Sequence, residues 1–175
     1  MDVETTLTLE TERLRLRPFL PSDFADYAEL CSDPEVMRYL GRGAPFDREL
    51  SWRHLAFLVG HRQLRGFGMW AMEAKETGTF LGKVGFAEPA GWPGFELAWT
   101  LARRFWGCGY ATEGARAALA HAFTALDKKR VISLIHPENH ASIRVAERLG
   151  ESLQGRTDFF GREFLVYGID RESWR

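Results

Sequence analysis

The stretch Phe95-Glu-Leu-Ala-Trp-Thr-Leu-Ala-Arg-Arg-Phe-Trp-Gly-Cys-Gly-Tyr-Ala-Thr112 joins an expected strand, a glycine-containing turn and the start of a helix. Apolar residues alternate through its first half and would form one strand face: Phe95, Leu97, Trp99 and Leu101. Glu96 would point to the opposite face. After the turn, small and apolar residues from Ala115 to Leu126 recur at helical spacing. We therefore expect a strand, a turn and a helix at the centre of the fold.

The turn contains Gly107 and Gly109 and is suited to binding an anion. Glycine lets backbone amides approach a phosphate, the first N–H groups of a helix lack intrahelical partners, and the helix dipole adds positive potential. Arg103 and Arg104 add charge nearby. A tight strand-to-helix connection without a ligand is the alternative. The dinucleotide fingerprint fails because Thr112 stands where glycine or alanine belongs, and no G-x-x-x-x-G-K-[ST] loop exists in the sequence.

The remaining elements can be placed around this unit. Alternating or clustered apolar residues predict strands over residues 7–17, 66–73, 79–87 and 131–135, and on both sides of residues 158–162. Capping and proline signals predict helices after Pro21, after Pro34, over 47–64, and over 139–149 with Asn139 as cap and Gly150 as stop. No linker or repeat divides the chain. The sequence predicts a single α+β domain over residues 1–175.

Composition excludes several classes of protein. The chain has 175 residues with 23 basic and 24 acidic side chains, and it is 45% hydrophobic and 13% aromatic. These values are typical of a folded domain. Basic side chains do not outnumber acidic ones, which argues against a nucleic-acid partner. No apolar run is long enough for a membrane span. Cys31 and Cys108 belong to no paired motif, which suggests reduced thiols in a cytoplasmic protein. His136 and His140 have no Cys or carboxylate set around them that would complete a zinc site.

Several segments resemble a known family. Arg104-Phe-Trp-Gly-Cys-Gly-Tyr-Ala111 is similar to the R/Q-x-x-G-x-G/A acetyl-CoA motif of the GCN5-related N-acetyltransferases, or GNAT family. Four ordered segments are similar to the RimJ/RimL type of ribosomal-protein N-terminal acetyltransferase: Thr11–Pro18, Ser32–Met37, Trp106–Glu113 and Asn139–Gly150. The resemblance covers residues 8–169, almost the whole chain. Gly150-Glu151 departs from the family pattern, in which an aromatic residue usually follows the glycine.

This resemblance implies a GNAT fold, in which a mixed and mostly antiparallel sheet splays at its central strand and carries helices on both faces. The pantetheine arm of acetyl-CoA would enter the gap, and its pyrophosphate would contact the amides of residues 105–112. A bulge in the strand from Phe95 to Ala102 would turn an N–H group toward the thioester carbonyl. The implied acetyl-CoA contacts are Leu97, Trp99, Thr100, Leu101, Arg104, Phe105, Trp106, Gly107, Cys108, Gly109, Tyr110, Ala111, Thr112, Asn139 and Ser142.

Transfer of an acetyl group to an amine requires a neutral amine, so a base or a water relay should remove a proton. Glu96 is the leading candidate, with a structural carboxylate as the alternative. The tyrosine that many family members place on the last motif helix is replaced here by Ala146. Ser142 then becomes the candidate donor to the CoA sulfur, unless its hydroxyl only bonds the backbone. Covalent catalysis by Cys108 is not expected, because no sequence pattern pairs a histidine with it.

The acceptor should enter opposite the cofactor, near Tyr39, Phe46, Trp52 and Trp70, although a buried aromatic residue is the default explanation of Trp52 and Trp70. It would be an amine-bearing small molecule or a protein N-terminus. The sequence therefore predicts an acetyl-CoA-dependent N-acetyltransferase that works by direct attack in a ternary complex. A non-catalytic domain that senses acyl-CoA is the alternative. The chain would act as a monomer or homodimer.

Overall fold

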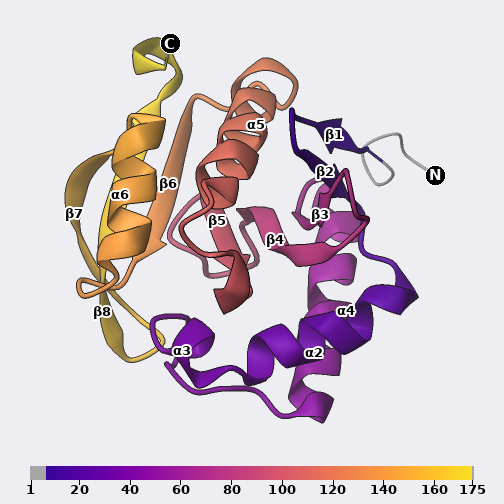
Figure 1. The fold of residues 1–175 in the computed structure, drawn as a ribbon. Helices are drawn as coiled ribbons and strands as arrows, with labels where there is room; N and C mark the ends of the chain where they lie inside the picture. Colours follow the sequence, from indigo (N-terminus) through magenta and orange to yellow (C-terminus); the bar gives the residue numbers. More distant parts are fainter. Residues whose placement is uncertain (1–6, 175) are drawn as a thin grey trace.

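The computed structural model describes residues 7–174, and Figure 1 shows them as one sheet flanked by helices. The strands are β1 Leu9–Glu10, β2 Leu14–Arg17, β3 Met69–Ala74, β4 Phe80–Ala87, β5 Glu96–Leu101, β6 Arg130–Ile135, β7 Ser152–Phe159 and β8 Arg162–Asp170. The helices are α2 Phe24–Ser32, α3 Pro34–Met37, α4 Arg48–Arg65, α5 Tyr110–Thr124 and α6 His140–Leu149. Short 3-10 turns lie at Pro21–Asp23, Arg103–Phe105 and Arg171–Ser173.

The strands form an eight-stranded sheet in the order β1-β2-β3-β4-β5-β6-β8-β7. Every neighbouring pair is antiparallel except β5 and β6, which run parallel and share one register pair, Glu96 with Ile132. Beyond that pair the two strands separate toward their C-terminal ends. This arrangement confirms the expected mixed sheet that splays at its central strand.

Two apolar clusters lie on opposite faces of the sheet. The side chains of α5 pack with Leu97 and Leu101, which the sequence predicted to share one face of β5. Residues of α2, α3 and α4 pack with Met69 and Ala71 of β3 on the other face. Figure 1 shows α5 across the middle of the sheet and α2 and α4 at its lower edge. Helices thus cover both faces of the sheet, and the gap between β5 and β6 is where we look for the functional site.

Two local predictions were wrong. The single strand expected over residues 7–17 is two antiparallel strands, because Thr11 accepts the Leu14 N–H through Oγ1 at 3.0 Å and closes a turn. The bulge expected in the central strand is not seen along its described pairing with β4, which is continuous from Gly82 with Leu101 to Ala87 with Glu96. A Cβ atom on Gly82 would lie 2.1 Å from the Thr100 carbonyl oxygen, so this glycine permits the close strand pairing that replaces a bulge.

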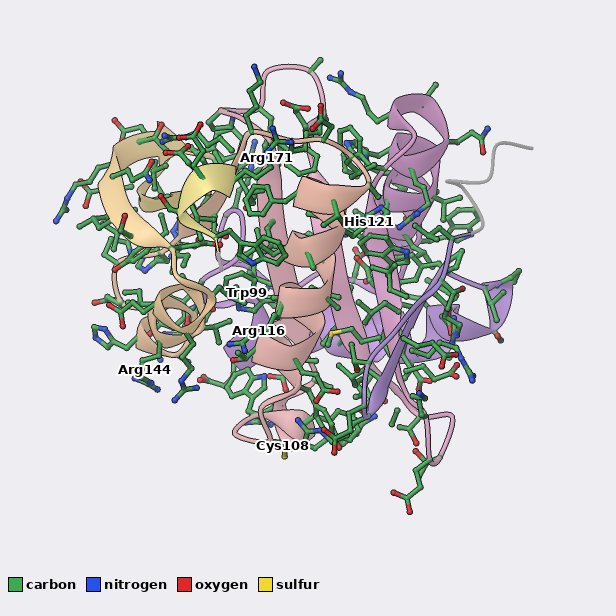
Figure 2. All side chains as sticks on the ribbon, turned by 90° about the horizontal axis from the view of Figure 1, so that it is seen from above. Trp99, Cys108, Arg116, His121, Arg144 and Arg171 are labelled. Carbon is green, nitrogen blue, oxygen red and sulfur yellow. The ribbon has the colours of Figure 1, made fainter. Side chains whose placement is uncertain are left out.

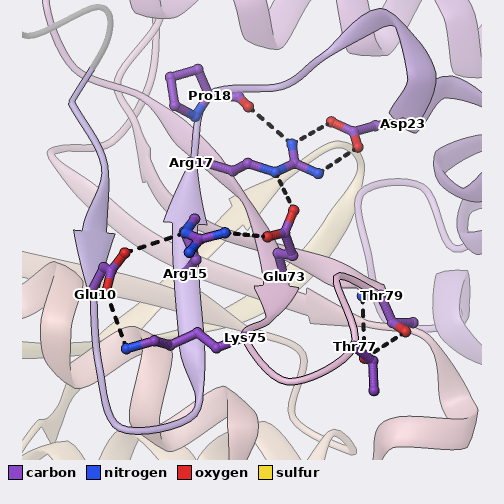
Figure 3. Close-up of polar contacts among 9 residues, drawn as sticks. All are labelled: Glu10, Arg15, Arg17, Pro18, Asp23, Glu73, Lys75, Thr77 and Thr79. Carbon is purple, nitrogen blue, oxygen red and sulfur yellow. Dashed lines mark hydrogen bonds and ion pairs between the residues drawn. The ribbon is translucent and has the colours of Figure 1, made fainter.

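Charged side chains join the first strands to the start of α2 (Figure 3). The guanidinium of Arg17 donates to both carboxylate oxygens of Asp23 at 2.8 Å and to Glu73 at 2.6 Å. Arg15 donates to the other oxygen of Glu73 at 2.9 Å. Bidentate pairing of arginine with carboxylate fixes geometry as well as charge. This network therefore holds the N-terminal hairpin and α2 on β3.

Candidate active site

The glycine turn before α5 has the geometry that the sequence predicted. Gly107 and Gly109 have φ of +75° and +82°, which lie in the left-handed region that favours glycine. Gly109 is the N-cap of α5 and supplies no side-chain acceptor to the first N–H groups of the helix. The helix begins at Tyr110, so these N–H groups and the positive end of the helix dipole lie together at the turn. The turn fits a phosphate or diphosphate.

Arg13 adds a cation to this turn that the sequence analysis missed. Its Nη1 donates to the Cys108 carbonyl at 3.0 Å, its Nε contacts Glu113 at 2.7 Å, and its guanidinium lies 4.5 Å from the centre of the Tyr110 ring. A Cβ atom on Gly109 would lie 3.4 Å from its Nη2. The signal was present, because Arg13 belongs to the segment from Thr11 to Pro18 that carries the family resemblance.

Arg103 and Arg104, expected beside the turn as mobile charges, contact carboxylates of the N-terminal helical region. Arg103 lies 3.3 Å from Asp33 and Arg104 lies 3.1 Å from Glu29. The two arginine side chains are 61% and 52% exposed. Ion pairs this exposed contribute little stability, so either guanidinium can exchange its partner for a phosphate at small cost.

A cavity of about 490 Å³ occupies the splay between β5 and β6. It reaches from the start of α6, at Asn139 and Ser142, to the segment from 39 to 46 and the face of β5 that carries Glu96. Its aromatic lining comprises Tyr39, Phe46, Trp92, Trp99, Phe159, Phe160 and Phe164. Arg162 of β8 donates to the carbonyls of Arg38 and Gly41 and so fixes the segment that forms one wall. A mostly apolar cavity with few polar groups is the usual form of a small-molecule site.

Glu96 is the carboxyl group placed in this cavity. It is 7% exposed, and its Oε2 accepts a hydrogen bond from the Trp92 indole N–H at 2.5 Å. Burial raises the pKa of Glu96 to about 7, although the Trp92 hydrogen bond and the charge of Lys83 act in the opposite direction. A carboxyl group with this pKa is partly ionised at neutral pH and can accept a proton.

A second buried carboxyl group, Glu151, lies behind the splay. Its Oε1 lies 3.0 Å from the Ser133 Oγ, which also lies 2.9 Å from the Leu97 carbonyl oxygen of β5. The one hydroxyl proton of Ser133 can go to either oxygen, and a protonated Glu151 can itself donate to Ser133 while Ser133 donates to Leu97. Burial raises the pKa of Glu151 to about 8, and the charge of Glu96 adds to the shift.

Other predicted site residues lie as follows. Asn139 caps α6 by accepting the Ser142 N–H at 3.2 Å, as the sequence predicted. Leu97, Trp99 and Thr100 line the cavity, and Trp99 packs against the cores on both sides of the splay. Figure 2 places Trp99 near α5 and Cys108 at the outer end of the preceding turn. The contacts of these residues with acetyl-CoA stay predictions, as do those of Leu101, Arg104, Phe105, Trp106, Gly107, Cys108, Gly109, Tyr110, Ala111 and Thr112.

Of the four residues expected near the acceptor, two line the cavity and two do not. Tyr39 and Phe46 line the cavity. Trp70 is 1% exposed, donates its indole N–H to the Leu7 carbonyl at 2.9 Å and packs on Phe86 in the core under α5. Trp52 is 59% exposed and packs near Phe24 outside the cavity lining. Neither tryptophan can contact an acceptor in the cavity.

The amino-acid sequence matches the model of the acetyltransferase (GNAT) domain from residue 13 to residue 151. The chain is a GNAT acetyltransferase. It is 36% identical to the uncharacterised protein YkkB of Bacillus subtilis over 99% of both chains. An acetyltransferase from Agrobacterium tumefaciens, with 32% identity, superposes with a TM-score of 0.83 over 93% of this chain and 94% of that one. Family membership favours an enzyme over the binding-only alternative.

GNAT acetyltransferases use acetyl-CoA, and a more distant structure shares this fold with coenzyme A bound. Mycobacterium smegmatis RimJ, in complex with CoA-disulfide, is 21% identical and has a TM-score of 0.73 over 91% of this chain and 82% of that one. The residues of the present GNAT domain fit the group: the turn at Gly107 and Gly109 would hold the diphosphate, and the apolar splay beside Leu97 would hold the pantetheine arm. When bound, acetyl-CoA supplies the reactive acetyl thioester.

No helix within residues 7–174 combines the length and the apolarity that a membrane span requires. Over the same residues no three His, Cys, Asp or Glu side chains gather as metal ligands would.

Proposed function

We propose that this acetyltransferase moves the acetyl group of acetyl-CoA to the nitrogen of a primary amine, with Glu96 as the general base. The observation that carries the proposal is the position of Glu96, which lies in the cavity at the splay and is held by Trp92. The amine would attack directly in a ternary complex. The exposed thiol of Cys108 lies at the outer turn, outside the cavity lining, which supports a route without a covalent enzyme intermediate.

Glu96 provides what a cationic acceptor needs. An alkylammonium group has a pKa of about 10.4 and an α-ammonium group about 8, so most acceptor molecules arrive protonated. The carboxylate of Glu96, with a pKa of about 7, can accept this proton directly or through one water. The Trp92 indole N–H orients the carboxylate for that transfer. Glu96 therefore converts the bound amine to its neutral nucleophilic form.

Ser142 is the proposed donor to the departing thiolate. Its backbone N–H is held by Asn139, which fixes the first turn of α6 at the cavity wall. The thiol of CoA is a good leaving group with a pKa near 8.5, so one hydroxyl donor is sufficient assistance. Removal of this hydroxyl should therefore matter less than removal of the Glu96 carboxylate.

The acceptor belongs to one of two proposed classes, a protein N-terminus or a small-molecule amine. The RimJ/RimL-like segments quoted above support the first class. The cavity supports the second, because a volume of about 490 Å³ with an aromatic lining is in the range of small-molecule sites. Release of free thiol from acetyl-CoA should be measured with a panel of amines, amino acids and peptides. Thiol release that stays at background with every acceptor, while acetyl-CoA binds, would favour a sensor over an enzyme.

The donor site can be tested separately by Gly109→Val. Valine at φ of +82° strains the turn, and its branched side chain would cover the N–H groups at the start of α5 and press on Arg13. We expect affinity for coenzyme A to fall about tenfold or more, measured by calorimetry. Gly78→Val is the control, because Gly78 has φ of +69° in the β3–β4 turn, where a Cβ meets nothing within 4 Å. If both variants bound coenzyme A as tightly as the parent, the diphosphate would not bind at this turn.

A further inference from the structure

Lys83 of β4 is a half-buried cation that the proposed chemistry does not use. It pairs across the sheet with Thr100 of β5 and lines the same cavity as Glu96. Side chains alternate along a strand, so Lys83, Thr100 and Glu96 share one face of the sheet. Among residues 7–174 no side chain or carbonyl forms a hydrogen bond or ion pair with the Lys83 ammonium. The ammonium of Lys83 can therefore donate hydrogen bonds to a ligand in the cavity.

The groups facing Lys83 do not neutralise it. Cys31 of α2 has its pKa raised by burial and stays a thiol. Burial, together with the charge of Lys83, lowers the pKa of His54 of α4 to about 3, so this imidazole is neutral. Glu96 is only partly ionised near neutral pH. Burial lowers the pKa of Lys83 itself, although the charge of Glu96 acts in the opposite direction, so the chain compensates this cation only in part. An anionic group of a bound ligand would complete this compensation.

The walls around Lys83 are apolar and aromatic. Met69 and Leu58 come from the cluster under α2 and α4, and both line the cavity. On another wall the Trp92 ring lies 4.6 Å from the Phe159 ring, measured between centroids, and 5.6 Å from the Phe160 ring. An occupant of this cavity therefore needs an apolar body. It also needs one anionic end to pair with the Lys83 ammonium, because opposite charges attract more strongly beside apolar walls than in bulk water.

We propose that Lys83 binds a carboxylate of the acetyl acceptor, and that the acceptor is an aromatic or branched apolar amino acid or a close analogue. The inference rests on the proposed function, since it names the acceptor of the same site. A carboxylate accepts two of the ammonium donors, while the amino group of the same molecule lies within reach of Glu96 on the shared face. An internal peptide bond next to a protein N-terminus offers only a neutral carbonyl. The cavity thus selects free amino acids over peptides.

The test compares acceptors that differ only in the carboxylate: phenylalanine with phenethylamine, tryptophan with tryptamine, and each amino acid with its amide. In the parent enzyme we expect kcat/KM to favour the carboxylate by about tenfold or more. Lys83→Met keeps the apolar stem without charge and should remove the preference, while Lys83→Arg should retain part of it. Lys75→Met is the control, because Lys75 pairs with Glu10 in the β3–β4 turn region, away from the cavity.

A binding arm separates this inference from the proposed function. Calorimetry without acetyl-CoA would measure the affinity of 3-phenylpropionate, which has the apolar body and carboxylate but no amine. We expect binding to the parent and a loss in Lys83→Met. If no amine were acetylated, the proposed function would be wrong. The binding measurement would then still show whether Lys83 binds a carboxylate. Equal binding in both proteins, an acceptor preference that survives in Lys83→Met, or a preference for peptides over amino acids would overturn the inference.

Discussion

Glu96→Gln is expected to lower kcat/KM for the amine by roughly 10² to 10⁴, the range that a positioned general base contributes. Glutamine is nearly isosteric, and its carbonyl oxygen can still accept the Trp92 indole N–H, so the cavity keeps its shape. What is lost is the proton acceptor. Steady-state thiol release over a range of pH and acceptor concentration would measure the effect.

The pH profile makes this result specific. Only the ionised form of Glu96 accepts a proton, so kcat/KM of the parent should fall as pH drops below about 7, and this limb should be absent in Glu96→Gln. Glu88→Gln is the control, because Glu88 lies just beyond β4 and outside the cavity lining. If Glu96→Gln kept the parental rate and the same acidic limb, another group would be the base.

The sequence predicted the central unit well because each signal there is local. Alternation along β5 separated Leu97 from Glu96, and each fell on the expected face. The glycines before α5 required a left-handed turn, and Asn139 capped α6 as its side chain predicts. Each of these features depends on the geometry of a few consecutive residues. They also include most of the proposed donor site.

The acceptor half was harder to predict because it is assembled from distant segments. β3 is buried on both faces, so its alternation could not show that Trp70 points to α5 while Met69 points to the cavity. Lys83 belongs to a strand that the sequence predicted only as one arm of a hairpin. The surroundings of its ammonium depend on α2, α4 and β5, which are separate from it in the sequence. No local sequence pattern predicts which distant elements will pack together. For the same reason the sequence did not predict the hydrogen bond from Trp92 to Glu96.

Glu151→Gln is expected to stabilise the protein at alkaline pH. The protonated carboxyl donates to Ser133, and a glutamine N–H can do the same, so the variant keeps the hydrogen bond to the strand that holds Leu97. The parent must keep a proton that the unfolded chain releases near the ordinary pKa of 4.5, whereas the folded pKa is about 8. The amide has no such proton to lose.

The sign follows from proton binding. Because the folded pKa of Glu151 is raised, its contribution to stability is complete below about pH 4.5 and is lost as pH rises toward about 8. The shift corresponds to a loss of up to about 5 kcal/mol in the free energy of unfolding. Urea denaturation should therefore find the parent and Glu151→Gln similar at acid pH and the variant more stable above pH 8. Since all other titrating groups are shared, the difference between the two curves isolates Glu151. A difference that stays constant from acid to alkaline pH would mean that this carboxyl is already ionised in the folded protein.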